Sequence, residues 1–324
     1  MFIVGASANV EVFNGNLKSN NFPKLPRKIL AAAMVIHNGT ILLCGGIDQD
    51  RKCLQLSHGT WKEHSTLNEP RWHHSAVATK TATFIFGGNL SRSRSTYEYL
   101  PKDSITWVKG KNEIPGGFDS GCAIAVKSEQ EIWLIGGFET GKRILSFNVV
   151  NHDFKELPLR LNVERSSHRC AYIPNTNKVM ISGGFKEDYL NSTEILDTEN
   201  RSVTMASPMN SRRLDHGIGA ITINGEDKLV VFGGVNGVIG KGRNWLDSVE
   251  IYNNRTDKWE TTTFKLSRAG HNFGFLAVKL ADIIQYMNYY VCDVCNDCFD
   301  CSFNLKQHRL ITHRISTFEV IFLH

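Results

Sequence analysis

A hydrophobic run that ends in Gly-Gly occurs five times in this 324-residue chain. Successive second glycines are 42, 49, 47 and 50 residues apart. The glycine pairs are Gly45-Gly46, Gly87-Gly88, Gly136-Gly137, Gly183-Gly184 and Gly233-Gly234. A repeat of this length indicates stacked supersecondary units, each of which buries its apolar faces against its neighbours. The period therefore restricts the fold before any single residue is considered.

Each repeat unit divides into four short segments that are typical of strands. The first follows a turn with Arg or His, the second is the run into Gly-Gly, and the third carries apolar or aromatic residues such as Tyr97 and Tyr99. The fourth often holds an aromatic residue, as at Trp107 and Trp259. Continuous apolar runs suit strands that are covered on both faces, and glycine at a strand end permits positive φ and close backbone approach. These features predict the four-stranded blades of a β-propeller.

The two ends of the repeat region complement each other. Residues 1–14 resemble the second and third strands of a unit, whereas residues 268–278 resemble a first strand with no partner after it. Joined, they make a sixth blade, which leaves the ring without an open sheet edge. The sequence therefore predicts an all-β, six-bladed propeller over residues 1–280, closed by strands from both ends.

The Gly-Gly runs, the aromatic positions and the period resemble kelch repeats over roughly residues 1–280. This resemblance implies a β-propeller that binds protein partners as a monomeric scaffold. No Ser/His/Asp set, phosphate-binding loop or paired carboxylates indicate catalysis, so we expect no enzymatic activity. The resemblance also raises the alternative of a substrate receptor for a cullin-type ubiquitin ligase, whose BTB or F-box module is not visible in this sequence.

The turns before the first strands carry basic side chains. They are Arg71, His73, Arg165, Arg212, Arg213 and Arg268. By the resemblance, these residues line a face that binds an acidic peptide, because arginine pairs well with carboxylates. The alternative is that they satisfy turn carbonyls or Asp and Glu of a neighbouring blade. The long loop 236–245 ends in Trp245, a further candidate for partner contact.

A second pattern lies near the C-terminus and has the spacing C-x2-C-x12-H-x4-H. Its members are Cys292, Cys295, His308 and His313. This spacing is typical of a tetrahedral zinc site. With Phe299 and Leu305 as a miniature core, residues 290–313 resemble a C2H2 zinc finger, which implies a ββα fold and a bound Zn²⁺. A segment of this size folds only with its metal. Residues 281–289 are then a linker and residues 314–324 a tail.

Two alternatives for this segment remain open. Cys298 and Cys301 could complete a four-thiolate site with Cys292 and Cys295, but the two histidines would then be unexplained. The segment could also be an unrelated exon joined to a propeller gene. In the finger interpretation, Asn304 and Gln307 occupy base-reading positions. A single finger covers about three base pairs, so binding of nucleic acid is expected to be weak.

The remaining features concern the cellular compartment. The N-terminus resembles no signal peptide, and no apolar run approaches the roughly 20 residues of a membrane span. We therefore expect an intracellular protein, in the cytoplasm rather than the nucleus, without membrane contact. The net charge of +5 is only mildly basic. In such a compartment, Cys44, Cys53, Cys122 and Cys170 are expected to be buried free thiols.

Overall fold

The computed structural model describes residues 23–266 apart from 48–50, 58, 92, 127 and 239–241, together with residue 269. Nearer the two ends of the chain it describes only the backbone of eight short strands. The described residues form strands and turns and contain no helix. They build an all-β propeller, as the sequence predicts.

The first three sheets are antiparallel and four-stranded, and each uses one continuous stretch of chain. The first sheet contains β4 (Ala33–His37), β5 (Thr40–Cys44), β6 (Lys52–Ser57) and β7 (Thr60–Thr66). The second contains β8 (Ser75–Ala78), β9 (Ala82–Phe86), β10 (Tyr97–Pro101) and β11 (Val108–Lys109). The third contains β12 (Cys122–Ala125), β13 (Glu131–Ile135), β14 (Arg143–Asn148) and β15 (Phe154–Arg160).

Two further sheets follow the same antiparallel order. The fourth contains β16 (Arg169–Tyr172), β17 (Lys178–Ser182), β18 (Thr193–Asp197) and β19 (Ser202–Ala206). The fifth contains β20 (Gly217–Ile223), β21 (Glu226–Phe232), β24 (Ser248–Asn253) and β25 (Lys258–Lys265). A hairpin of β22 (Val235–Val238) and β23 (Gly242–Trp245) is inserted between β21 and β24.

Strands from both ends of the repeat region meet in one further four-stranded sheet, described for its backbone only. Its order is β26 (Gly274–Ala277), β1 (Phe2–Gly5), β2 (Val10–Phe13) and β3 (Lys18–Ser19). Strands β1 and β26 pair antiparallel, with Ile3 opposite Leu276. Because its side chains lie outside the description, five blades are described in full, rather than the six that the sequence predicts.

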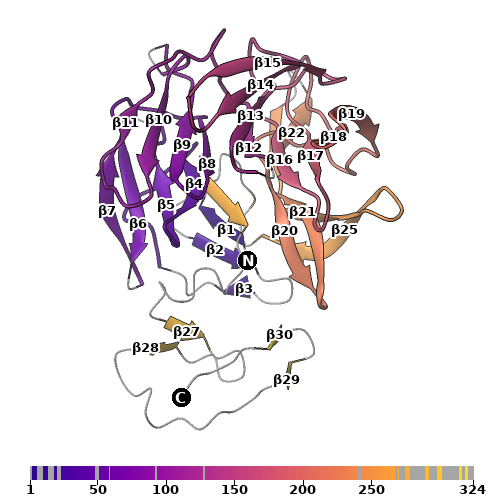
Figure 1. Cartoon of the computed structure of the whole chain (residues 1–324). Helices are drawn as coiled ribbons and strands as arrows, with labels where there is room; N and C mark the ends of the chain where they lie inside the picture. Colours follow the sequence, from indigo (N-terminus) through magenta and orange to yellow (C-terminus); the bar gives the residue numbers. More distant parts are fainter. Residues whose placement is uncertain are drawn as a thin grey trace.

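The sheets are arranged around a common centre (Figure 1). Their first strands adjoin one another in the order β4, β8, β12, β16 and β20, and the backbone of β26 adjoins both β20 and β4. Much of the core lies between neighbouring blades, since four of the six main clusters combine side chains of two sheets. For example, Leu42 of the first blade packs in one cluster with Ile85 and Trp107 of the second. This packing explains why the second strands are continuous apolar runs.

Both glycines of a pair are needed where one blade meets the next. A Cβ on Gly45 would lie 2.8 Å from Cε1 of His74, and Gly45 has a φ of +69°. The amide of Gly46 donates to the carbonyl of Arg71 at 2.8 Å. The same amide-to-carbonyl contact joins Gly137 to Arg165 and Gly184 to Arg213. The Gly-Gly signature is therefore an inter-blade contact as well as a strand end.

One left-handed residue precedes the first strand of each fully described blade. These residues are Ala31, His73, Ser120, Ser167 and Asp215, with φ between 50° and 56°. Each of the last four donates its amide hydrogen to the carbonyl of the equivalent residue one blade earlier, at 3.0, 3.1, 2.6 and 3.0 Å. We call this chain of hydrogen bonds the axial belt. It fixes the spacing of the turns that surround the centre of the ring.

Four cysteines that the sequence analysis expects to be free thiols are paired as disulfides, which corrects that prediction. Cys44 and Cys53 join β5 to β6, with their Cα atoms 4.1 Å apart. Cys122 and Cys170 join β12 to β16 of the next blade, with a Cα separation of 6.0 Å. The sequence spacings of 9 and 48 residues gave no indication of pairing, because the partners meet only when the strands are assembled.

The finger segment lies almost entirely outside the described residues. Strand β27 (Tyr289–Val291) pairs antiparallel with β28 (Cys298–Asp300), and Tyr290 lies opposite Phe299. A second short pair joins β29 (Arg314–Ile315) to β30 (Phe318–Glu319). The four predicted zinc ligands, the helix expected to carry Asn304 and Gln307, and Cys301 lie outside the description. Both the finger and its boundaries stay predictions.

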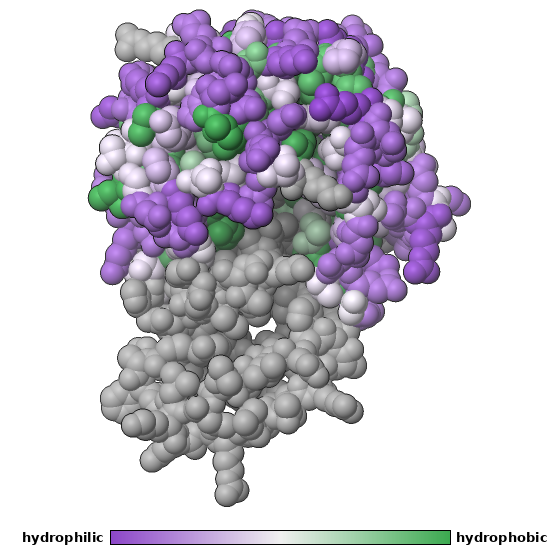
Figure 2. Space-filling view, viewed as in Figure 1, coloured by the Kyte–Doolittle hydropathy of each residue, from purple (hydrophilic) through white to green (hydrophobic). Residues whose placement is uncertain are grey.

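The viewed surface of the described blades is largely hydrophilic, with small separate hydrophobic patches (Figure 2). In the part of the chain that the structure describes, no helix has the length and apolar character that crossing a membrane requires.

Three histidines are buried between blades at equivalent positions: His74, His168 and His216. Among the described residues, neither ring nitrogen of His74 or His168 has a hydrogen-bond partner, whereas Nε2 of His216 lies 2.7 Å from the Ser182 hydroxyl. Burial, and then the charge of Arg71, lowers the pKa of His74 to about 3. Burial likewise holds the pKa values of His168 and His216 well below their usual range.

We predict that acid destabilises the propeller through these histidines. Each stays neutral in the folded state but takes up a proton in the unfolded state below pH 6.5, so stability falls as the pH drops from about 6.5 towards the folded pKa. From pH 7 to pH 5, each histidine contributes a loss of about 2 kcal/mol. Urea denaturation of His168→Leu at both pH values should show a pH dependence smaller by about that amount. A variant with the parent's pH dependence would contradict this account.

Candidate binding face of the propeller

Three of the arginines expected on a binding face are buried instead. Arg71, Arg165 and Arg213 pair with Glu98, Glu194 and Glu250 at 3.0, 2.8 and 2.8 Å, and all six side chains are 0% exposed. Each arginine also donates from Nη1 to the carbonyl of the first glycine of its own blade's pair, at 2.7 Å in every case. The prediction that these three contact a partner is therefore corrected: they join the turn, the Gly-Gly run and the third strand of one blade.

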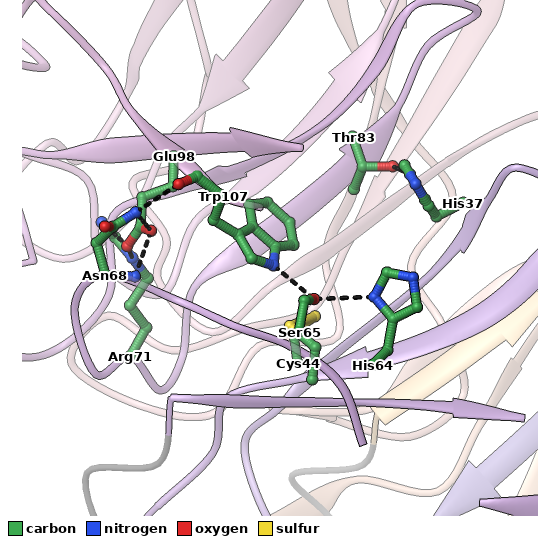
Figure 3. Close-up of a disulfide and its surroundings, with 10 residues drawn as sticks. His37, Cys44, His64, Ser65, Asn68, Arg71, Thr83, Glu98 and Trp107 are labelled. Atoms are coloured by element: carbon green, nitrogen blue, oxygen red, sulfur yellow. Dashed lines mark hydrogen bonds and ion pairs between the residues drawn. A yellow bond between two sulfur atoms is a disulfide. The ribbon is translucent and has the colours of Figure 1, made fainter. Parts of the chain in front are cut away.

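The glutamate of each pair also accepts from a second set of donors, which Figure 3 shows for Glu98. Oε2 of Glu98 accepts from the backbone amide of Asn68 at 2.6 Å and from its side-chain amide at 2.8 Å. Oε1 also accepts from the Glu69 amide at 3.0 Å. Burial lowers the pKa of Arg71, and the charge of Glu98 opposes that shift. Because the carboxylate has donors on both oxygens, the buried ion pair is fully hydrogen-bonded.

A sequence signal for this network existed and the sequence analysis did not use it. The spacing Asn-x-x-Arg-x-x-His occurs at Asn68 to His74, Asn162 to His168 and Asn210 to His216. The asparagine binds the glutamate, the arginine bridges glutamate and glycine, and the histidine packs on the preceding blade. An arginine at this spacing therefore has defined partners inside the protein, unlike an exposed residue that is available to contact another protein.

The turns of the axial belt surround a cavity of about 440 Å³, which we call the axial pocket. It is lined by His73, Asn89, Arg94, Asp119, Ser120, Phe138, Ser166, Ser167, Leu214, Asp215, Val235 and Arg243. These residues come from the turns before β8, β12, β16 and β20, and from the segments that follow β9, β13 and β21. The pocket therefore lies where four blades meet. Of the predicted contact residues, it includes His73.

Two acidic side chains in the pocket are nearly buried. Asp119 is 2% and Asp215 is 4% exposed. Oδ1 of Asp119 accepts from the Ser120 hydroxyl at 2.8 Å, and Oδ2 lies 3.8 Å from Nη2 of Arg94. Burial raises the pKa of Asp119, while the Ser120 hydrogen bond and the charges of His73 and Arg94 lower it. Oδ1 of Asp215 lies 3.5 Å from Nη2 of Arg169 and 3.9 Å from Nδ1 of His73.

The mouth of the pocket carries exposed side chains of mixed character. Phe138 is 56% exposed and lines the pocket. On the β22–β23 hairpin, Arg243 lines the pocket and Trp245 is 51% exposed. Arg212 is also exposed, but it is not among the pocket-lining residues and its guanidinium pairs with Asp188. Of the contact residues that the sequence suggested, His73, Arg212 and Trp245 are thus at least partly accessible, whereas Arg268 lies outside the described residues.

The chemistry of the described pocket is that of polar recognition. Within the described ranges, no group of three His, Cys, Asp or Glu side chains is arranged to hold a metal ion. Sequence reasoning missed Asp119, Asp215, Arg94, Phe138 and Arg243. Asp119 and Asp215 lie in the turns of the third and fifth blades, 96 residues apart, and only the assembled ring shows that they share one cavity.

Comparison with known proteins supports the repeat and the fold. A family model described as "Kelch motif" matches residues 222–263, which include all of β21 and β24 and most of β25. A kelch repeat-containing protein of Dictyostelium discoideum is 24% identical over 209 residues, which are 57% of this chain and 30% of that protein. The solved structure of YjhT covers 75% of this chain and 86% of its own, with a TM-score of 0.64 and 13% identity. The chain thus spans less than a third of its curated relative, and the similarity to YjhT concerns the fold alone.

These comparisons confirm the kelch repeat and the β-propeller that the sequence predicts. Propellers of this kind are typically protein-interaction scaffolds and commonly bind protein partners. The matches above concern the repeat and the fold, and the four predicted zinc ligands lie outside the described residues.

We predict that two adjacent arginines differ sharply in their effect on stability. Arg213→Met leaves Glu250 buried without its partner, which costs about 3–5 kcal/mol. Arg212→Met removes only an exposed pair with Asp188, worth about 0–1 kcal/mol. Guanidinium denaturation of both variants measures the difference. Equal losses for the two variants would show that Arg213 does not hold the blade together.

Proposed function

We propose that this chain is a non-catalytic scaffold whose propeller holds a segment of a partner protein against the axial pocket. The observation that carries the proposal is the pocket itself, a cavity of about 440 Å³ formed by four blades with accessible Phe138 at its mouth. Aromatic and arginine side chains beside a depression are characteristic of the residues that dominate protein interfaces. Trp245, on the hairpin that also carries Arg243, extends this surface.

The proposed partner segment carries acidic side chains. Arg243 lines the pocket, is exposed, and makes no ion pair with any described residue. Arg212 adds a second exposed guanidinium, although Asp188 already neutralises part of its charge. His73 contributes a further nitrogen beside Asp215. The buried arginines Arg71, Arg165 and Arg213 take no part in this proposed surface.

We further propose that the sheet β26-β1-β2-β3 is the sixth blade of a closed, monomeric ring. Support comes from the β1–β26 pairing and from the position of β26 between β20 and β4. The Arg-x-x-His spacing also recurs at Arg268 and His271, just before β26. Closure leaves the inner strands without a free edge.

The zinc-binding finger is a separate proposal that rests on spacing. Cys292, Cys295, His308 and His313 would hold one Zn²⁺, whose role there is structural. The antiparallel pairing of β27 with β28 is compatible with the two strands of a ββα finger. A ligase-receptor role, weak nucleic-acid binding through Asn304 and Gln307, and a cytoplasmic location likewise stay predictions.

We predict that the full chain selects peptides from a random display library through the axial face. For an enriched peptide, Phe138→Ser and Trp245→Ala should each weaken binding about tenfold or more, because exposed aromatics supply much of the energy of such contacts. Fluorescence anisotropy measures the dissociation constants. Ile105→Ser is the matched control, since Ile105 is 69% exposed and is not among the pocket-lining residues. Equal effects of all three substitutions, or no enriched peptide, would refute the proposed face.

Native mass spectrometry of the full chain tests the finger. We expect one bound zinc, which His308→Asn with His313→Asn removes. The matched control is Cys298→Ser with Cys301→Ser, which should retain the metal. Loss of zinc in the control instead would favour the four-thiolate site, and a metal-free parent chain would remove the finger from the proposal.

A further inference from the structure

The acidic side chains of the axial pocket are short of hydrogen-bond donors. Asp119 and Asp215 are 2% and 4% exposed, yet both line the cavity. Among the described residues, Oδ2 of Asp119 accepts no hydrogen bond, and its nearest cation, Arg94, lies 3.8 Å away. The single hydrogen bond to Asp215 from a described side chain is the 3.5 Å contact of Arg169 with Oδ1. Nearly buried carboxylates are stabilised strongly by a charged donor.

Arg169 pairs with Oδ1 of Asp215 at 3.5 Å, and the other cations near these carboxylates are engaged elsewhere or lie farther away. Nη1 of Arg94 donates to both carboxylate oxygens of Glu139, at 3.0 Å each. His73 is charged only when protonated, and its Nδ1 is 3.9 Å from Asp215. Both carboxylates line the cavity, and Oδ2 of each accepts no hydrogen bond from a described side chain.

An aromatic side chain lies beside the two carboxylates. Phe138 lines the same pocket and is 56% exposed. A ring face next to carboxylates is a favourable environment for an ammonium or guanidinium group, because the ring quadrupole and the carboxylates attract the same charge. A carboxylate or phosphate placed at the floor would instead be repelled by Asp119 and Asp215.

The opposite charge is found at the mouth. Arg243 is exposed and makes no ion pair with any described residue. A ligand that placed a cation at the floor would thus benefit from an anion near Arg243. Such a distribution fits a short stretch of polypeptide better than a simple ion, because neighbouring side chains supply both charges.

We propose that the axial pocket binds the lysine or arginine side chain of a protein segment, between Asp119, Asp215 and Phe138, while Arg243 pairs with an adjacent acidic residue of that segment. The inference rests on the proposed scaffold function and specifies its ligand. The segment is held by its basic residue, and the acidic residue sets its direction across the mouth.

Display selection tests this inference directly. A random-peptide library is selected against the full chain, and in parallel against Asp215→Asn, Asp119→Asn and the control Asp103→Asn, which removes an exposed carboxylate that is not among the pocket-lining residues. We expect a fixed Lys or Arg with an acidic neighbour in peptides from the parent chain and from the control. Replacing that basic residue, or either pocket aspartate, should weaken binding about tenfold or more.

The outcomes separate the two proposals. Enriched peptides without a fixed basic residue would overturn this inference and leave the scaffold function standing, whereas the absence of enriched peptides would overturn both. Thermal melting of each variant establishes that it is folded. If an aspartate variant fails to fold, Arg243→Gln gives an independent test: it should remove the preference for the acidic neighbour and keep the preference for the basic residue. An unchanged preference would contradict the proposal.

Discussion

The buried arginine–glutamate pair is the interaction on which the architecture of the described blades depends. In three blades, a guanidinium without solvent exposure binds a glutamate of the third strand and a carbonyl of the Gly-Gly run at once. The energetic cost of burying both charges is offset by the donors that the asparagine turn supplies. A side chain with this many simultaneous partners leaves the turn before the first strand with a single conformation.

That fixed turn has a consequence at the centre of the ring. The residue two positions after each arginine adopts a left-handed conformation and hydrogen-bonds to its counterpart one blade earlier. The histidine that follows packs on a glycine of that earlier blade. The spacing between blades is thus set by backbone groups, and the belt residues are free to differ in side chain. The axial pocket shows this freedom, since its floor carries His, Ser and Asp at equivalent positions.

Arginines in this propeller therefore have two different roles. Arginines inside the blades are structural because each is buried and binds a glutamate and a glycine carbonyl, whereas the pocket-lining Arg243 has no ionic partner among the described residues. Residue type alone does not distinguish the two groups. The Asn-x-x-Arg-x-x-His spacing does distinguish them, because its asparagine and histidine belong to the same network of contacts as the buried arginine.

The sequence by itself determined the repeat, the four-stranded unit and the meeting of β1 with β26, because glycine pairs and apolar runs are local features that recur at intervals of 42 to 50 residues. Only the tertiary structure decided that Cys122 joins Cys170 and that Asp119 and Asp215 share one cavity. These relations connect residues about 50 or 100 positions apart in the chain. They arise from the closure of the ring around its axis, a geometric condition that no local pattern of residues encodes.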